Sequence, residues 1–259
     1  MNEKVMTNME FAERLVACAR NFKTLYVKGC FGAPMTEANK KRYTSNNSYN
    51  KREDRKKLIM AASADTFGFD CCCLPKGIAW GWYGDPDKTY GGAVYKSHGV
   101  PDLGTEGMIA SCQDRSTDFQ HIEIGELCWM EGHVGVYVGG GLCVECTPRW
   151  SDDVQITACN RTVEGYHRRD WTKHGKLPWI DYQTQVTVQL EKLSKGTKGE
   201  QVKTLQRLLL ALGYDLQKYG ADGSFGSVTE KAVRAFQADR DLTVDGSVGA
   251  ATWDRLLKG

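Results

Sequence analysis

The chain has 259 residues, enough for one large domain or two modest ones. Its hydrophobic content of 41% and charged content of 25% are those of an ordinary globular protein, and a net charge of +2 excludes a strong general attraction to nucleic acid. No apolar run is long enough to span a bilayer. Residues 1–10 are polar and lack the apolar core of a secretion signal, so we expect the chain to stay in the cytoplasm in which it is made until something else releases it.

The sequence contains ten cysteines. A chain of this length can build a core without disulfides, so we expect reduced thiols that are buried or catalytic. Zinc is the alternative. Cys143-x-x-Cys146 supplies only half of a four-ligand site, and on a strand the two side chains would point to opposite faces. We therefore expect no metal and no other cofactor.

The first predicted element is an amphipathic helix over Met9–Tyr26, capped by Thr7 or Asn8. Residues 34–57 are polar and basic, and we interpret them as an inserted surface loop near the cleft. An attraction of this loop to anionic polymers is the second interpretation, which Glu53 and Asp54 make weaker by diluting the positive charge. Residues 58–64 follow as a short helix.

A cluster of thiols follows in Phe69-Asp70-Cys71-Cys72-Cys73-Leu74. Cysteine suits acyl transfer because its thiolate is strongly nucleophilic and forms a thioester that water can hydrolyse. A helix N-terminus and a neighbouring imidazolium would lower the pKa of such a thiol. Pro75 removes a backbone donor just beyond the cluster, so the helix that follows must be kinked or begin late.

The stretch 132–146 has the pattern of a β-hairpin. Apolar and other residues alternate from His133 to Val138, three glycines permit a tight reversal, and Leu142–Cys146 alternates in turn. If the apolar sets share the core face, His133 and Glu145 share the opposite face and lie across from each other. A carboxylate in that position fixes the tautomer of the imidazole and stabilises its cation.

These motifs together resemble the NlpC-type cell-wall cysteine peptidases over most of the first two-thirds of the chain. That family carries its nucleophile in an Asp-Cys-Ser-Gly-Leu/Phe block and its base in a Gly-His-Val-Gly-Ile/Val-Tyr strand. The resemblance implies Cys71 as nucleophile, His133 as base and Glu145 as the residue that orients His133. It also implies that Asp70 grips a free amine of the substrate, although capping of a helix is the structural alternative.

Two further assignments depend on this resemblance. Residues 24–32 resemble the Pro-Tyr-Val-Trp-Gly-Gly segment of the family, which would make Tyr26 an oxyanion-stabilising residue. A packed aromatic side chain with a satisfied hydroxyl is the alternative for Tyr26. Cys72 and Cys73 replace the family's Ser and Gly, and we expect them to be small buried packing residues.

The last part of the sequence contains an internal repeat. A helix with leucines at helical spacing ends at Gly213, and the turns Asp222–Gly226 and Asp245–Gly249 each precede a further helix. This pattern closely resembles the three-helix peptidoglycan-binding domain over residues 195–257. The polar stretch before it predicts a linker.

We therefore predict an α+β, papain-like catalytic domain with an antiparallel sheet at residues 1–182, a linker at 183–193 and an all-α wall-binding domain at 194–259. The resemblance implies a monomeric, endolysin-like peptidoglycan hydrolase that acts on the wall after release, without nucleic acid or membrane insertion. The expected bond is the γ-D-glutamyl–diamino-acid link. The alternatives are an N-acetylmuramoyl-L-alanine amidase, a wall-binding protein with an inactive catalytic domain, and a toxin or general protease.

Overall fold

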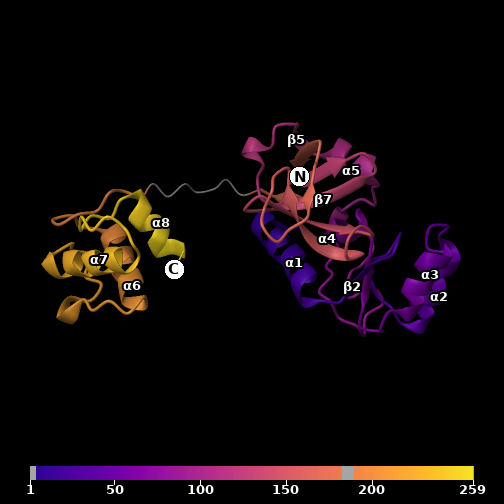
Figure 1. Ribbon diagram of the computed structural model, residues 1–259, viewed down its shortest axis with the longest axis horizontal. Helices are drawn as coiled ribbons and strands as arrows, with labels where there is room; N and C mark the ends of the chain where they lie inside the picture. The colour runs from indigo at the N-terminus through magenta and orange to yellow at the C-terminus, as the bar shows by residue number, and fades with distance from the viewer. Residues whose placement is uncertain (1–3, 183–189, 259) are drawn as a thin grey trace. The chain divides into compact units, whose positions relative to one another are not determined.

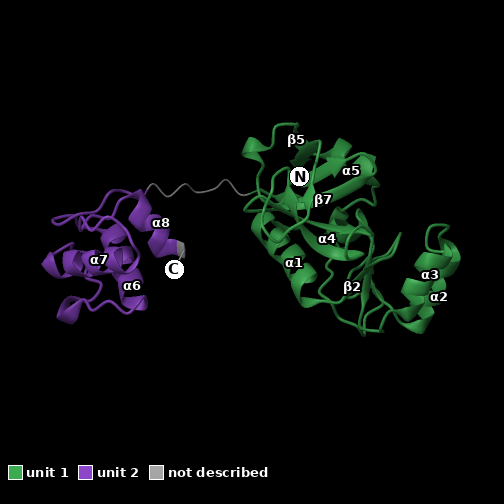
Figure 2. Cartoon of the chain, viewed as in Figure 1, with its two compact units in different colours: residues 1–184 green, residues 185–259 purple. Residues whose placement is uncertain are grey.

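The computed structural model describes residues 4–182 and 190–258. The chain divides into two compact units, residues 1–184 and 185–259 (Figures 1 and 2). Most of the predicted linker, 183–189, lies outside the described residues. In the part of the chain that is described, no helix combines the length and the apolar character needed to cross a membrane.

The first unit mixes helices and strands, as the sequence predicted. Its elements are β1 (Met6–Thr7), α1 (Asn8–Asn21), β2 (Thr24–Tyr26), β3 (Phe31–Pro34), α2 (Glu37–Asn46), α3 (Glu53–Ala61), β4 (Phe67–Phe69), α4 (Cys73–Ala79), η1 (Ser97–Gly99), α5 (Thr105–Ser111), β5 (Gln113–Ser116), η2 (Phe119–His121), β6 (Leu127–Met130), β7 (His133–Gly139), β8 (Leu142–Thr147), β9 (Asp153–Cys159), β10 (Arg168–Arg169), β11 (Lys173–Lys176) and β12 (Ile180–Asp181).

A seven-stranded sheet with the order β10-β9-β8-β7-β6-β11-β5 forms the frame of this unit. The predicted hairpin is present as β7 and β8, but its register differs from the expectation. Val136 pairs with Val144, so Glu145 falls opposite Gly135 and only diagonal to His133. The reversal uses Gly140 and Gly141, both with positive φ, so that Gly139 pairs with Leu142. A bulge between Tyr137 and Gly139 then shifts the pairing by one residue and sets the register of the remaining strand.

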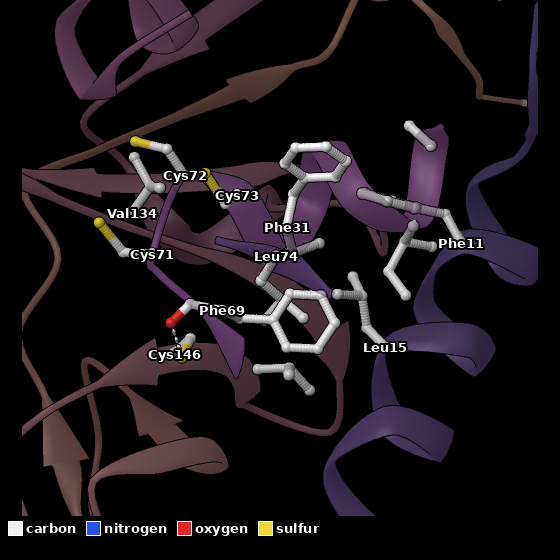
Figure 3. Close-up of a cluster of buried hydrophobic side chains, with 14 of the residues drawn as sticks. Phe11, Leu15, Phe31, Phe69, Cys71, Cys72, Cys73, Leu74, Val134 and Cys146 are labelled. Atoms are coloured by element: carbon white, nitrogen blue, oxygen red, sulfur yellow. Dashed lines mark hydrogen bonds between the residues drawn. The ribbon is translucent and has the colours of Figure 1, made fainter. Parts of the chain in front are cut away.

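Helix α1 packs against the apolar side of the β7–β9 strands. It begins at a Thr7 cap whose hydroxyl accepts the Glu10 N–H at 3.1 Å, and its side chains Phe11 and Leu15 are fully buried (Figure 3). The helix is shorter than predicted. Residues 24–26 form β2 instead, and they pair with β4 in a small sheet of order β2-β4-β3.

The expectation of a loop at 34–57 was wrong, because these residues contain α2 and α3. The buried side chains of α2 are Lys40, Tyr43 and Thr44, so the helix lacks the apolar stripe by which a sequence pattern reveals a helix. Between the two helices, the fully buried Asn50 donates to the carbonyls of Lys28 and Tyr43. This contact ties the α2–α3 region to the β2–β3 connection.

The second unit consists of α6 (Glu200–Ala211), η3 (Gln217–Tyr219), α7 (Ser227–Asp239) and α8 (Ala250–Lys258) around its own apolar core. A buried glutamine holds each of the two repeated turns. Gln206 donates to Asp222 at 2.8 Å and accepts from Gly223 at 2.7 Å. Gln237 makes the equivalent bonds at the second turn. The sequence repeat is therefore a repeat of hydrogen bonding.

Candidate active site

Cys71 lies at the junction between β4 and α4, with Phe69 and Leu74 of the core beside it (Figure 3). Asp70 fixes this junction. Its Oδ1 accepts the Cys73 N–H and its Oδ2 accepts the Gly29 N–H, both at 2.7 Å. Asp70 thus has the capping contact of the structural alternative, and both oxygens are already occupied by backbone donors.

Pro75 falls in the first turn of α4, which begins at Cys73. In the first turn a helix does not need the proline's missing N–H, so the helix continues through it. This agrees with the expectation of a late start.

The imidazole of His133 interacts with the Cys71 thiol, although the two residues are far apart in sequence. A hydrogen bond from the Cys72 thiol and a second one from His133 lower the pKa of Cys71 to about 5 against the opposing effect of burial. Burial would lower the pKa of His133, but its bonds to Cys71 and Glu145 outweigh this effect and raise the pKa to about 9. At pH values between these two pKa values, Cys71 is a thiolate and His133 is an imidazolium.

Glu145 orients the imidazole from the other side. His133 Nε2 lies 2.7 Å from Glu145 Oε2, which leaves Nδ1 as the ring nitrogen available to the thiol. The Glu145 side chain has no exposed surface, and burial works to raise its pKa. Hydrogen bonds from His133 and Arg169 dominate and lower the pKa of the carboxyl, so Glu145 is an anion inside the protein.

Arg169 on the short strand β10 is the main further partner of this carboxylate. Its Nη2 donates to Glu145 Oε2 at 2.6 Å and its Nε lies 3.1 Å from both carboxylate oxygens. Thr157 Oγ1 donates to Oε1 at 2.7 Å. No local sequence signal marks Arg169, because it lies 24 residues from Glu145 and belongs to a two-residue strand.

Trp171 fixes the plane of the His133 ring. The two rings stack with centroids 5.5 Å apart and planes at 7°. A side chain at residue 135 would collide with this indole, because a Cβ built there would come within 2.8 Å of Trp171. Gly135 therefore makes room for the residue that supports His133, which explains a glycine in the middle of β7.

A cleft of about 520 Å³ opens over the thiol. Tyr26 lines it beside Cys71 and is nearly buried, which is compatible with either role considered for this tyrosine. Lys28 also lines the cleft and is exposed, with its backbone held by Asn50. The remaining lining residues are Asp70, Cys72, Cys73, Lys76, Asp102, Leu103, Gly104, Thr105 and Gly132.

The first unit contains a second buried pair of a histidine and a carboxylate, His174 and Glu126. His174 Nδ1 pairs with Glu126, and its Nε2 lies 2.8 Å from the carbonyl oxygen of Asp118. Both ring nitrogens are therefore occupied, and His174 has no free nitrogen to activate a nucleophile. The arrangement supports the choice of His133 as the reactive imidazole.

A comparison with known families matches residues 198–256 to the family described as "Putative peptidoglycan binding domain". One curated relative is the N-acetylmuramoyl-L-alanine amidase CwlL of Bacillus licheniformis, 52% identical over 60 residues, which are 23% of this chain and 17% of that protein. Another is the zinc D-Ala-D-Ala carboxypeptidase of Streptomyces albus G, 35% identical over 66 residues, or 26% of each chain.

Among solved structures, a Burkholderia AP3 phage endolysin is 42% identical over 26% of this chain and 24% of that one, with a TM-score of 0.24. The match spans 17% of the length of each of the first two curated relatives. The similarity to the curated enzymes covers only the binding domain, so it assigns no chemistry to the first unit.

Proposed function

We propose that the chain is an endolysin-like peptidoglycan hydrolase whose first unit cuts an amide bond of the stem peptide by thiol catalysis. The observation that carries the proposal is that His133 interacts both with the Cys71 thiol and with the buried Glu145 carboxylate. The cleft over Cys71 is large enough for a short peptide. The match of the second unit to a peptidoglycan-binding family supports the wall as the target.

In the proposed reaction, the Cys71 thiolate attacks the carbonyl carbon of the amide. The His133 imidazolium gives its proton to the leaving amine as the C–N bond breaks, which leaves a thioester on Cys71. Water then attacks the thioester while His133 takes its proton. His133 keeps this proton as an imidazolium. The C–S bond then breaks, which restores the Cys71 thiolate and releases a carboxylic acid. The backbone N–H of Cys71 and the Tyr26 hydroxyl are the proposed oxyanion donors.

Lys28 suggests how the cleft recognises its substrate. Stem peptides carry free carboxylates, and Lys28 places an exposed cation on the wall of the same cleft as Cys71. A charge-assisted hydrogen bond to such a carboxylate would position the substrate without taking part in the chemistry.

The second unit would keep the enzyme on its substrate. A binding domain tethered to a catalytic one raises the effective concentration of the polymer. A cavity of about 320 Å³ in this unit, lined by the exposed Tyr219 and by residues of the Asp222–Gly226 turn and the start of α7, is the candidate contact. An aromatic ring beside polar groups suits a sugar polymer.

The bond that is cut is testable on purified walls. We expect mass spectrometry of the released fragments to show a new amino terminus on the diamino acid, as cleavage of the γ-D-glutamyl link requires. A new amino terminus on L-alanine would assign the amidase activity instead. Cleavage of casein at a comparable rate would indicate a general protease, and binding without any released fragment would indicate an inactive catalytic domain.

A further inference from the structure

Three cysteines that play no part in the proposed mechanism meet inside the first unit. Cys128 on β6, Cys143 on β8 and Cys159 at the end of β9 have sulfur atoms that all lie within 4.8 Å of one another. Cys128 and Cys143 are fully buried, and Cys159 is 5% exposed. Their sulfur atoms thus form one triangle in the interior of the first unit.

The strands hold these sulfurs near one another while keeping the backbones apart. Strand β7 lies between β6 and β8, and neighbouring strands are about 4.8 Å apart, so the backbones at Cys128 and Cys143 are farther apart than the roughly 7 Å limit of a disulfide. Cys143 pairs with Thr157, which puts Cys159 in a diagonal position about 7–8 Å away. The geometry therefore disfavours a disulfide for these two pairs.

The same geometry fits a metal ion. Zn–S bonds of about 2.3 Å put the sulfurs of a tetrahedral site about 3.8 Å apart. The sulfurs of Cys128 and Cys143 are 3.5 Å apart. Cys146, the other half of the motif weighed from the sequence, lies on the opposite face and donates to the Phe69 carbonyl at 3.3 Å. The two cysteines of this motif therefore point to opposite faces of β8, as the alternation of side chains on a strand predicted.

We propose that Cys128, Cys143 and Cys159 bind one thiophilic ion, Zn²⁺, as three thiolates. Binding releases three protons and leaves a complex with a net charge of −1. Among the residues that the structure describes, no fourth His, Cys, Asp or Glu joins the cluster. The fourth position would then hold water from the adjoining cavity of about 220 Å³, which Cys159 lines. Arg161 lines the same cavity and supplies a compensating positive charge.

The ion would stabilise the structure around the catalytic pair of Cys71 and His133. Trp171, which stacks on His133, packs in the same buried cluster as the three cysteines. The ion joins β6, β8 and β9, and β8 carries Glu145. The site therefore stabilises the strands that position His133 and Glu145. It is separate from the reacting atoms.

The test is the metal content of the full chain, produced in zinc-supplemented medium and purified with a reducing agent and without chelator. We expect about one zinc per chain, and less than about a tenth of that in Cys143→Ser and Cys159→Ser. Cys112→Ser is the matched control: its thiol is also buried and donates to the Met108 carbonyl at 3.3 Å, a bond that a serine hydroxyl can keep. This control should retain the zinc.

Further measurements on the wild-type protein test the proposal even if a variant fails to fold. Wild-type protein reconstituted with Co²⁺ should show a thiolate-to-cobalt charge-transfer band, and removal of zinc should lower Tm by more than about 5 °C. Wild-type protein that binds neither Zn²⁺ nor Co²⁺ while all ten thiols react would overturn the site. So would retention of zinc by both cluster variants, or an intact mass lower by the two hydrogens of a disulfide. None of these readouts depends on wall cleavage.

Discussion

Arg169 donates through Nη2 to Glu145 at 2.6 Å, on the same carboxylate oxygen that bonds His133. The residue that orients the imidazole is thus itself held by a buried guanidinium. The carboxylate has no exposed surface and the arginine side chain is 8% exposed, so each charge depends on the other for solvation.

Replacing Arg169 by methionine should leave an uncompensated charge in the interior. We expect Arg169→Met to lower the free energy of unfolding by about 3 kcal/mol and to lower kcat more than it raises KM, because Arg169 does not line the cleft. Arg168→Met is the matched control, since Arg168 is exposed and forms an ion pair with the exposed Asp170. Denaturation curves and steady-state kinetics of both variants make the comparison. Equal stability of the two variants would show that the buried pair does not hold Glu145.

The plot of kcat/KM against pH should be bell-shaped, with an acid limb near pH 5 and a basic limb near pH 9. Cys71 has a pKa of about 5, so below that value the thiolate gains a proton and the nucleophile is lost. His133 has a pKa of about 9, so above that value the imidazolium loses the proton that the leaving amine needs. Measurement of kcat/KM from pH 4 to 10 checks both limbs. A single limb near 8.5, as for an ordinary thiol, would contradict the ion pair.

Cys72 should set the acid limb of that profile. Its hydrogen bond is the largest effect that lowers the pKa of Cys71, so Cys72→Ala should move the limb up by about one pH unit. Cys72→Ser keeps a hydroxyl donor and should restore the limb. This pair of variants separates hydrogen bonding from packing, the role first expected for Cys72. If the alanine and serine variants share one profile, the hydrogen bond has no effect on the thiolate.

Lys28 should affect binding and leave the chemistry unchanged. We expect Lys28→Met to raise KM about fivefold on a soluble stem-peptide substrate with kcat nearly constant, as for the loss of one partly solvated charge pair. Lys51→Met, another exposed lysine that the cleft lining does not include, serves as control. A fall in kcat with KM unchanged would assign Lys28 a different role.

The sequence predicted those features that depend on local pattern. The alternation at 133–138 and the glycines after it gave the β7–β8 hairpin, and the repeated turns gave the helical second unit, whose match to a peptidoglycan-binding family confirms that part. The predicted register was wrong because Gly139 pairs with Leu142 across a two-residue turn and a bulge between Tyr137 and Gly139 then shifts the pairing, which brings Glu145 opposite Gly135. The local pattern gives no sign of the length of such a turn.

Other features depend on contacts between distant parts of the chain. Arg169 is in a two-residue strand and acquires its role only through the buried carboxylate of Glu145. Helix α2 buries Lys40 and Tyr43 in place of an apolar stripe. The cysteine cluster draws one residue from each of three strands. Tertiary contacts define all three features, so local periodicity could not predict them.

The most direct test of the thiol mechanism is the clearing of purified cell walls by Cys71→Ala beside Cys73→Ala. Both cysteines are 8% exposed and lie two residues apart, but only Cys71 interacts with His133. We predict that Cys71→Ala loses at least about 10³-fold in rate while still sedimenting with the walls, and that Cys73→Ala retains most of its activity. Equal clearing by Cys71→Ala and the wild-type protein would contradict the assignment of the nucleophile.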